Sequence, residues 1–254
     1  MLFRSVRAKE TWRLKSSVSG CHSVKRDDPN LEMLQLAADG LQPFLEDVVF
    51  VGGCATGLLI NDLAAPPTRE TKDVDVIVEI ASLHDYYQLA GKLRNRGFRE
   101  DKSEGAPMCR WTFGAVTVDV MPTDAAILGF SNRWYSEAIA NAIRVSLPAG
   151  IVIRLVAAPW FLATKLEAFY GRGNGDYMAS HDIEDLIAVL DGRESVVHEV
   201  EQSGAVGRYL AGEFGRLLAL EEFHDALPCH LPSDAASQMR ASIVIERIAA
   251  ISGF

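Results

Sequence analysis

The sequence has few cysteines, and none of them lie close together. Four are spread over 254 residues, at Cys21, Cys54, Cys109 and Cys229. Structural zinc sites usually show cysteines two to four residues apart, and disulfide-framework proteins are short and rich in cysteine. The sequence therefore predicts neither a zinc site nor a disulfide framework. This cysteine usage fits a reducing compartment, and we expect a cytoplasmic protein.

The chain also lacks long apolar runs and an excess of positive charge. No run approaches the roughly 18 apolar residues that a membrane-spanning helix needs, so we expect no membrane contact. The formal net charge is -9. This charge argues against a protein that coats nucleic acid, but a local basic patch could still dock one end of an RNA.

Composition and pattern divide the chain into three parts. Residues 1–30 hold seven Lys or Arg against three Asp or Glu, with little hydrophobic periodicity. They are interpreted as a poorly ordered leader, and a basic RNA-binding arm or a transit peptide are the alternatives. A mixed sheet with flanking helices is predicted over residues 31–157, and a helical region over 158–254. The predicted fold class is α+β.

The centre of the pattern is an apolar run that ends at two glycines. Val48–Val51 reads as a buried strand, Gly52-Gly53 breaks it, and a helix is predicted near residues 54–63. Glycines let backbone N–H groups approach a ligand closely, and a following helix would point its positive end at the same place. The turn is therefore a candidate phosphate site.

Three aspartates on two predicted strands form a candidate metal site. Asp73 and Asp75 alternate with apolar residues, so they project together, with Cβ atoms roughly 6–7 Å apart. Asp119 lies in the second strand of a hairpin predicted around Gly114-Ala115. A buried carboxylate is costly without a partner, and a divalent cation would supply one. The alternative for Asp119 is a strand-end acid exposed to water.

A group of basic side chains follows the first predicted strands. A helix is predicted over residues 82–96, with Ser82 as its cap and Gly97 as its stop. Six basic residues at and beyond its end could receive a polynucleotide backbone, but such a run is more often a solvated face, the interpretation we favour. They are Lys92, Arg94, Arg96, Arg99, Lys102 and Arg110.

The combination of glycines and aspartates resembles a known signature. Two glycines, a spacer and D-x-D are similar to the nucleotidyltransferase superfamily that includes DNA polymerase beta. The longer form Arg69-Glu70-Thr71-Lys72-Asp73-Val74-Asp75 resembles the AbiEii-type toxins of abortive-infection and type IV toxin-antitoxin systems. In that family a lysine, an arginine and a D-x-x-D-L helix follow, which Lys165, Arg172 and residues 182–186 match. The resemblance covers residues 48–186, roughly half of the chain.

The resemblance implies a fold, an activity and a set of site residues. The fold is a polymerase-beta-like core whose nucleotide site is completed by the helical region. The activity is transfer of a nucleoside monophosphate from an NTP to a hydroxyl, with Mg²⁺ or Mn²⁺ held by three acids. Asp119 is the candidate base. The implied acceptor is RNA such as the 3′ end of a tRNA, and the implied partner is an antitoxin protein. Residues expected at the nucleotide are Gly52, Gly53, Thr71, Lys165, Arg172 and Asp182.

Alternatives remain open at this stage. Lys165 could extend to solvent, Asp182 could only stabilise a helix N-terminus, and Thr71 could be a turn hydroxyl. An antibiotic-modifying transferase would use the same metal site on a small-molecule hydroxyl. A catalytically idle module that binds a nucleotide or a partner is the rival of another class. The sequence identifies neither the NTP nor the acceptor.

Overall fold

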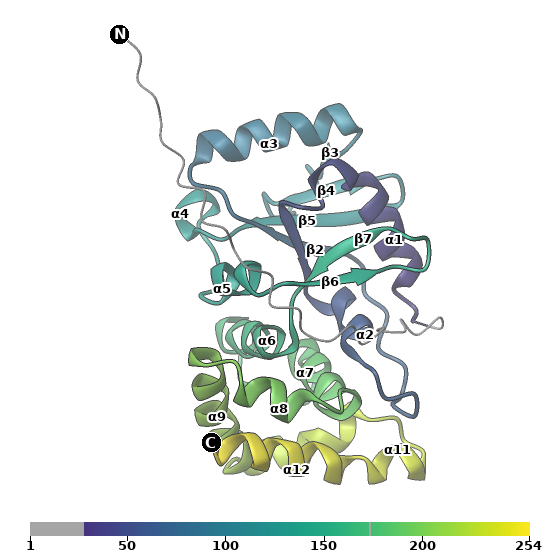
Figure 1. Ribbon diagram of the computed structural model, residues 1–254, viewed down its shortest axis with the longest axis vertical. Coiled ribbons are helices and arrows are strands. Elements are labelled where there is room, and N and C mark those ends of the chain that lie inside the picture. Colours follow the sequence, from purple (N-terminus) through teal and green to yellow (C-terminus); the bar gives the residue numbers. More distant parts are fainter. Residues whose placement is uncertain (1–27, 173) are drawn as a thin grey trace.

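The computed structural model describes residues 28–172 and 174–254. Most of the predicted leader, residues 1–27, lies outside these described residues. Within them, seven strands form one sheet in the order β3-β4-β5-β2-β1-β7-β6 (Figure 1). The strands are β1 (Val48–Val51), β2 (Val74–Val78), β3 (Arg99–Glu100), β4 (Arg110–Phe113), β5 (Val116–Pro122), β6 (Ile143–Ser146) and β7 (Val152–Leu155).

The centre of the sheet mixes parallel and antiparallel pairing. β1 pairs antiparallel with β2, while β2 pairs parallel with β5, and β1 pairs parallel with β7. β1 is buried along its whole length, as its unbroken apolar run predicts. The hairpin of β4 and β5 turns at Gly114, whose φ of 59° favours glycine.

Helices cover both faces of the sheet. α1 (Leu31–Gly40) packs on the sheet face that carries the β5 valines. Its last residue, Gly40, lies against the ring of Phe113. α3 (Leu83–Arg96) begins at Ser82, whose hydroxyl accepts from the Asp85 amide, and ends at Gly97, as predicted. On the opposite face, α5 (Tyr135–Ala140) contacts β1 and β2. Ile77 is therefore buried although it lies on the same face as Asp75.

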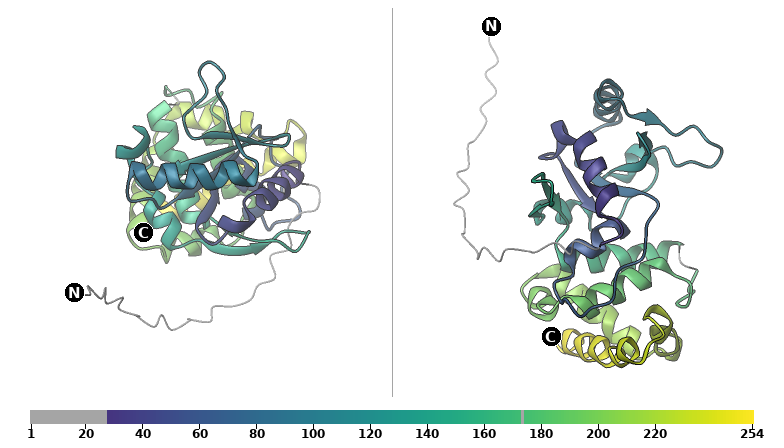
Figure 2. Two further views of the ribbon diagram at one scale, coloured as in Figure 1. Left: turned by 90° about the horizontal axis from the view of Figure 1, so that it is seen from above. Right: turned by 90° about the vertical axis from the view of Figure 1, so that its right-hand side faces the viewer.

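The described chain from residue 158 onward is helical, and its helices gather at one end of the sheet (Figures 1 and 2). This arrangement confirms the predicted α+β class with a helical C-terminal region. No described helix is long and apolar enough to cross a membrane. The other helices are α2 (Thr56–Leu59), α4 (Ala125–Leu128), α6 (Ala158–Arg172), α7 (His181–Gly192), α8 (Val196–Glu201), α9 (Ala205–Leu218), α10 (Glu221–Ala226), α11 (Ala235–Met239) and α12 (Ala241–Ser252).

The helix predicted near residues 54–63 is wrong in length. A 3-10 turn at Gly53–Ala55 leads into α2, which ends at Leu59 because Ile60 is extended. The next two amides, of Asn61 and Asp62, both donate to the Gly192 carbonyl at the end of α7. Backbone bonds to a distant helix thus replace the bonds that would have continued α2. A helix of one turn also has little dipole to offer a phosphate.

The loop before β2 is fastened by a buried asparagine. Asn30 is 1% exposed, and its Nδ2 donates to the Arg69 carbonyl at 2.9 Å. Its Oδ1 accepts from the Thr71 amide at 2.8 Å. A side-chain amide that bonds both a carbonyl and an amide fixes the course of this loop. The placement of Arg69 and Thr71 therefore depends on a residue about forty positions earlier.

We predict that Asn30→Ala lowers the free energy of unfolding by about 1–3 kcal/mol, because it leaves buried backbone groups of the loop without partners. Urea unfolding monitored by circular dichroism measures this change. Asn95→Ala, at an exposed position of α3, is the matched control and should cost nothing. An equal loss in both variants would contradict the fastening role.

Candidate functional site

The two glycines allow two acidic side chains to approach the end of β1. Gly52 has a φ of 72°, and a Cβ there would lie 1.9 Å from Oδ2 of Asp75. A Cβ on Gly53 would lie 2.5 Å from Nη2 of Arg69 and 3.1 Å from Oδ2 of Asp185. Gly52 is therefore required by its backbone conformation and by the Asp75 side chain, whereas a Cβ at Gly53 would have to displace the end of the Arg69 side chain.

The three predicted acids lie on one face of two neighbouring strands. Asp75 and Asp119 are directly opposite each other in the parallel pairing of β2 with β5. Asp73 is two residues before Asp75 and projects to the same side. Asp119 is only 7% exposed, which excludes the alternative of a water-exposed strand end. The sequence-based placement of the three carboxylates is confirmed, although their role as metal ligands stays a prediction.

Arg110, which the sequence placed in a solvated basic run, instead joins these acids. It lies opposite Asp119 in the antiparallel pairing of β4 with β5. Its Nε donates to Oδ1 of Asp119 at 2.9 Å and its Nη2 to Oδ2 at 2.8 Å. The same Nη2 donates to Oδ2 of Asp73 at 2.9 Å. The hydrogen bonds that Arg110 donates to Asp119 raise the pKa of Arg110, so the guanidinium is a permanent cation.

Within the part of the chain that the structure describes, no arginine bonds the Asp75 side chain, and its ionised form is destabilised. Burial, together with the neighbouring charge of Asp73, raises the pKa of Asp75 to about 7. Lys165 acts in the opposite direction, and Asp119 adds to the increase. A site with three carboxylates and one guanidinium thus retains an excess of negative charge, which an added cation would relieve.

The three carboxylates are suitable ligands for Mg²⁺, but they do not form a complete metal site by themselves. Among the described residues, no three His, Cys, Asp or Glu side chains are grouped closely enough to hold a metal ion. Mg²⁺ is usually held by one or two carboxylates together with substrate phosphates, so a full protein cage is not required. Asp73 and Asp75 supply two such carboxylates, and Asp119 lies beside them. Arg110 occupies the space between Asp73 and Asp119.

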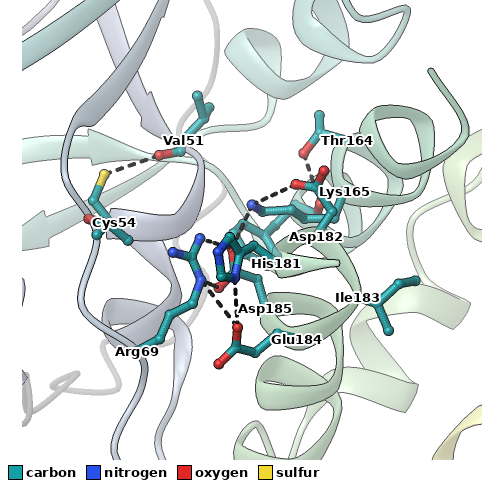
Figure 3. A network of polar contacts seen from close by, with 12 residues as sticks. Val51, Cys54, Arg69, Thr164, Lys165, His181, Asp182, Ile183, Glu184 and Asp185 are labelled. Atoms are coloured by element: carbon teal, nitrogen blue, oxygen red, sulfur yellow. Dashed lines mark hydrogen bonds and ion pairs between the residues drawn. The ribbon is translucent and has the colours of Figure 1, made fainter. Parts of the chain in front are cut away.

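Lys165 is buried at the centre of a second charged group (Figure 3). It is 6% exposed in α6, and its Nζ lies 3.1 Å from Oδ1 of Asp182 and 2.6 Å from Oδ2 of Asp185. Burial alone would lower the pKa of Lys165, but the charges of Asp185 and Asp182 raise it above its ordinary value. The solvent-extended alternative for Lys165 is therefore wrong. The lysine is a fixed positive charge whose field reaches Asp75.

Arg172 and Asp182 belong to the same group. Nε and Nη2 of Arg172 each lie 3.1 Å from an oxygen of Asp182. Burial would raise the pKa of Asp182, but Lys165 and Arg172 hold it below the usual range. Asp182 is thus more than a helix N-terminal acid. The hydroxyl of Thr71 contacts groups of the loop and its fastening residue, since it lies 3.2 Å from both Oδ1 of Asn30 and the Asp73 carbonyl.

Three further residues at the site were not selected from the sequence. Arg69 donates to both oxygens of Asp185 at 3.0 Å (Figure 3). Asp185 of α7 also accepts from Lys165, so it joins the loop before β2 to α6. The signal was the three-residue spacing of Asp182 and Asp185, which puts both on one helix face. Tyr135 of α5 lies in the field of Asp75, which, after burial, raises the pKa of its hydroxyl. That hydroxyl lies 3.6 Å from the sulfur of Met121.

An open pocket of about 870 Å³ lies elsewhere, beyond the carboxyl ends of β2 and β5. Its lining includes Glu79, Asp124 and Arg133. Glu79 is four residues from Asp75 along the strand, a rise of about 13 Å. The pocket is therefore separate from the three acids.

Comparisons with known proteins leave the family open. No family model matches the sequence, and no curated protein matches it. Six chains of solved structures match. One is the crystal structure of ANT(2″)-Ia in complex with adenylyl-2″-tobramycin, at 15% identity and a TM-score of 0.39. That match covers 69% of this chain and 93% of the other. A likeness this distant assigns no function, so the chemistry of the site rests on its own residues.

We predict that Asp75→Asn stabilises the protein most at alkaline pH. The unfolded carboxyl ionises near its ordinary pKa, whereas the folded one keeps its proton until about pH 7. Between these two pKa values the folded state binds more protons than the unfolded state. The free energy of unfolding of the unsubstituted protein therefore falls as pH rises from the ordinary pKa to the raised one. The gain should be on the order of 2–4 kcal/mol at about pH 8 and should vanish near about pH 4.

Urea unfolding at these pH values, in the presence of a chelator, measures this gain. Asp47→Asn, at an exposed position before β1, is the control and should show no pH-dependent gain. A gain for Asp75→Asn that is the same at both pH values would contradict the raised pKa.

Proposed function

We propose that the protein is a metal-dependent nucleotidyltransferase, which moves a nucleoside monophosphate from an NTP to a hydroxyl and releases pyrophosphate. One observation carries the proposal. Asp73, Asp75 and Asp119 share one face of two adjacent strands, and Asp75 lies beside the Gly52-Gly53 turn and within the field of Lys165. Carboxylates that face a glycine turn and a buried cation suit the chemistry of phosphoryl transfer.

Each residue has a distinct task in this proposal. Asp73 and Asp75, with Asp119, would hold Mg²⁺ or Mn²⁺, which when bound neutralises phosphate charge and lowers the pKa of the attacking hydroxyl. Lys165 places a positive charge beside the triphosphate, and Asp182 and Asp185 fix the position of its ammonium group. Arg172, held by Asp182, supplies a second charge nearby. For Asp119 to act as base, it would accept a proton on an oxygen that also accepts from Arg110, since Arg110 bonds both oxygens.

The acceptor is the finer part of the proposal. The R-E-T-K-D-V-D sequence and the later K, R and D-x-x-D-L residues resemble AbiEii-type toxins, and on that basis we propose an RNA acceptor such as the tRNA 3′ end. An antitoxin protein is then the expected partner. The rivals are a small-molecule hydroxyl and an idle module, and both are outcomes of the experiment below.

We predict Mg²⁺-dependent incorporation of label when the protein is incubated with each α-³²P-NTP, total RNA and a small-molecule extract. Gel and thin-layer separation show which acceptor is labelled, and pyrophosphate release gives an independent readout. Asp73→Asn and Asp75→Asn should both abolish transfer, because each removes a charged oxygen ligand of the cation. The exposed-site control Asp47→Asn should keep full activity.

The outcomes separate the rivals. Label on tRNA supports the toxin-type activity, and label on a small molecule alone supports the antibiotic-type activity. No label with any NTP and either acceptor pool supports the idle module. Full activity in the Asp73 and Asp75 variants would overturn the metal assignment.

A further inference from the structure

One guanidinium nitrogen is shared by two of the proposed cation ligands. Nη2 of Arg110 lies 2.9 Å from Oδ2 of Asp73 and 2.8 Å from Oδ2 of Asp119. It is thus located where a cation held by both carboxylates would be. The guanidinium brings one positive charge, and a divalent cation brings two.

The two ends of this bridge differ in exposure. The side chain of Asp119 is 9% exposed and receives two bonds from Arg110, so its buried charge depends on the guanidinium. The side chain of Asp73 is 32% exposed and receives one bond. Solvent can replace that single bond at low cost. The bridge therefore opens most readily at Asp73.

A cation at Asp73 and Asp75 competes directly with this bond. A bound cation repels the guanidinium and uses the carboxylate oxygen that Nη2 now contacts. Asp119 can keep Arg110 at the same time, because a carboxylate has about four lone-pair sites. Exchange therefore requires only a small movement of Nη2 away from Asp73.

We propose that Arg110 is an internal counter-ion that a divalent cation must displace from Asp73, so that this arginine sets the cation affinity of the site. The inference rests on the proposed metal-dependent function. Arg110 is a positioning residue in this scheme, because it acts through Asp73 and Asp119. It stabilises the acids when no cation is bound and weakens cation binding by the free energy of the Asp73 contact.

The test measures Mn²⁺ binding to the full chain by the electron paramagnetic resonance signal of free Mn²⁺. Arg110→Gln should bind Mn²⁺ on the order of tenfold more tightly than the unsubstituted protein, as expected for loss of one charge-assisted hydrogen bond. Arg99→Gln removes the same charge from an exposed position of β3 and should leave the affinity unchanged. Circular dichroism verifies that each variant is folded.

Arg110→Lys separates displacement from simple loss of charge. Its ammonium keeps the positive charge but lacks the planar fork that bonds both oxygens of Asp119 while reaching Asp73. Tighter Mn²⁺ binding by this variant supports displacement, and it also supplies the test if Arg110→Gln does not fold. A purely structural role would instead weaken Mn²⁺ binding in both variants.

Two results overturn the inference, and they are distinguishable. If the unsubstituted protein binds Mn²⁺, Asp75→Asn does not, and neither Arg110 variant binds more tightly, the counter-ion role is wrong while the metal site stands. If neither the unsubstituted protein nor the Arg110 variants bind Mn²⁺, the inference is wrong, and the proposed metal-dependent function fails with it only if the labelled-NTP assay also gives no transfer.

Discussion

The repulsion between carboxylates on neighbouring strands is the constraint that organises this molecule. Asp75 and Asp119 are opposite each other in a parallel pair, and Asp73 is two residues away. Removing such groups from water is costly unless cations compensate them. Arg110 compensates Asp73 and Asp119, whereas Asp75 depends on the more distant field of Lys165. The neighbouring cations therefore neutralise only part of the negative charge of the three aspartates.

The second charged group solves the same problem with different partners. Asp185 is bonded by Arg69 from the loop before β2 and by Lys165 from α6. Asp182 accepts hydrogen bonds from Lys165 and Arg172. Each acid is satisfied by two cations, which come from α6 for Asp182 and from α6 and the loop before β2 for Asp185, so both positions are fixed by the tertiary structure. The Lys165 ammonium is consequently held in one position, as its proposed role beside a triphosphate requires.

The sequence predicted those features that depend on local periodicity. Alternation put Asp73 and Asp75 on one strand face, and the turn at Gly114 gave the hairpin that carries Asp119. The position of Asp119 beside the other two acids was expected from the polymerase-beta-like pattern, not from local periodicity. Pairings over long sequence distances were missed, because no local pattern encodes them. Arg69 is 116 residues from Asp185, and Arg110 resembled any other member of a basic run. The helix expected after Gly53 was too long because its amides bond Gly192, which no local pattern indicates.

The bond between Arg69 and Asp185 also bears on when the protein acquires its final form. Sheet residues 48–155 leave the ribosome before α7, yet the Gly53 turn is packed against Arg69 and Asp185. Domains fold progressively as they are synthesised, and contacts distant in sequence form last. A nascent chain that ends before residue 182 thus has its acidic strands but lacks both carboxylates that hold Lys165. The charged group around Lys165 is complete only after translation has passed α7.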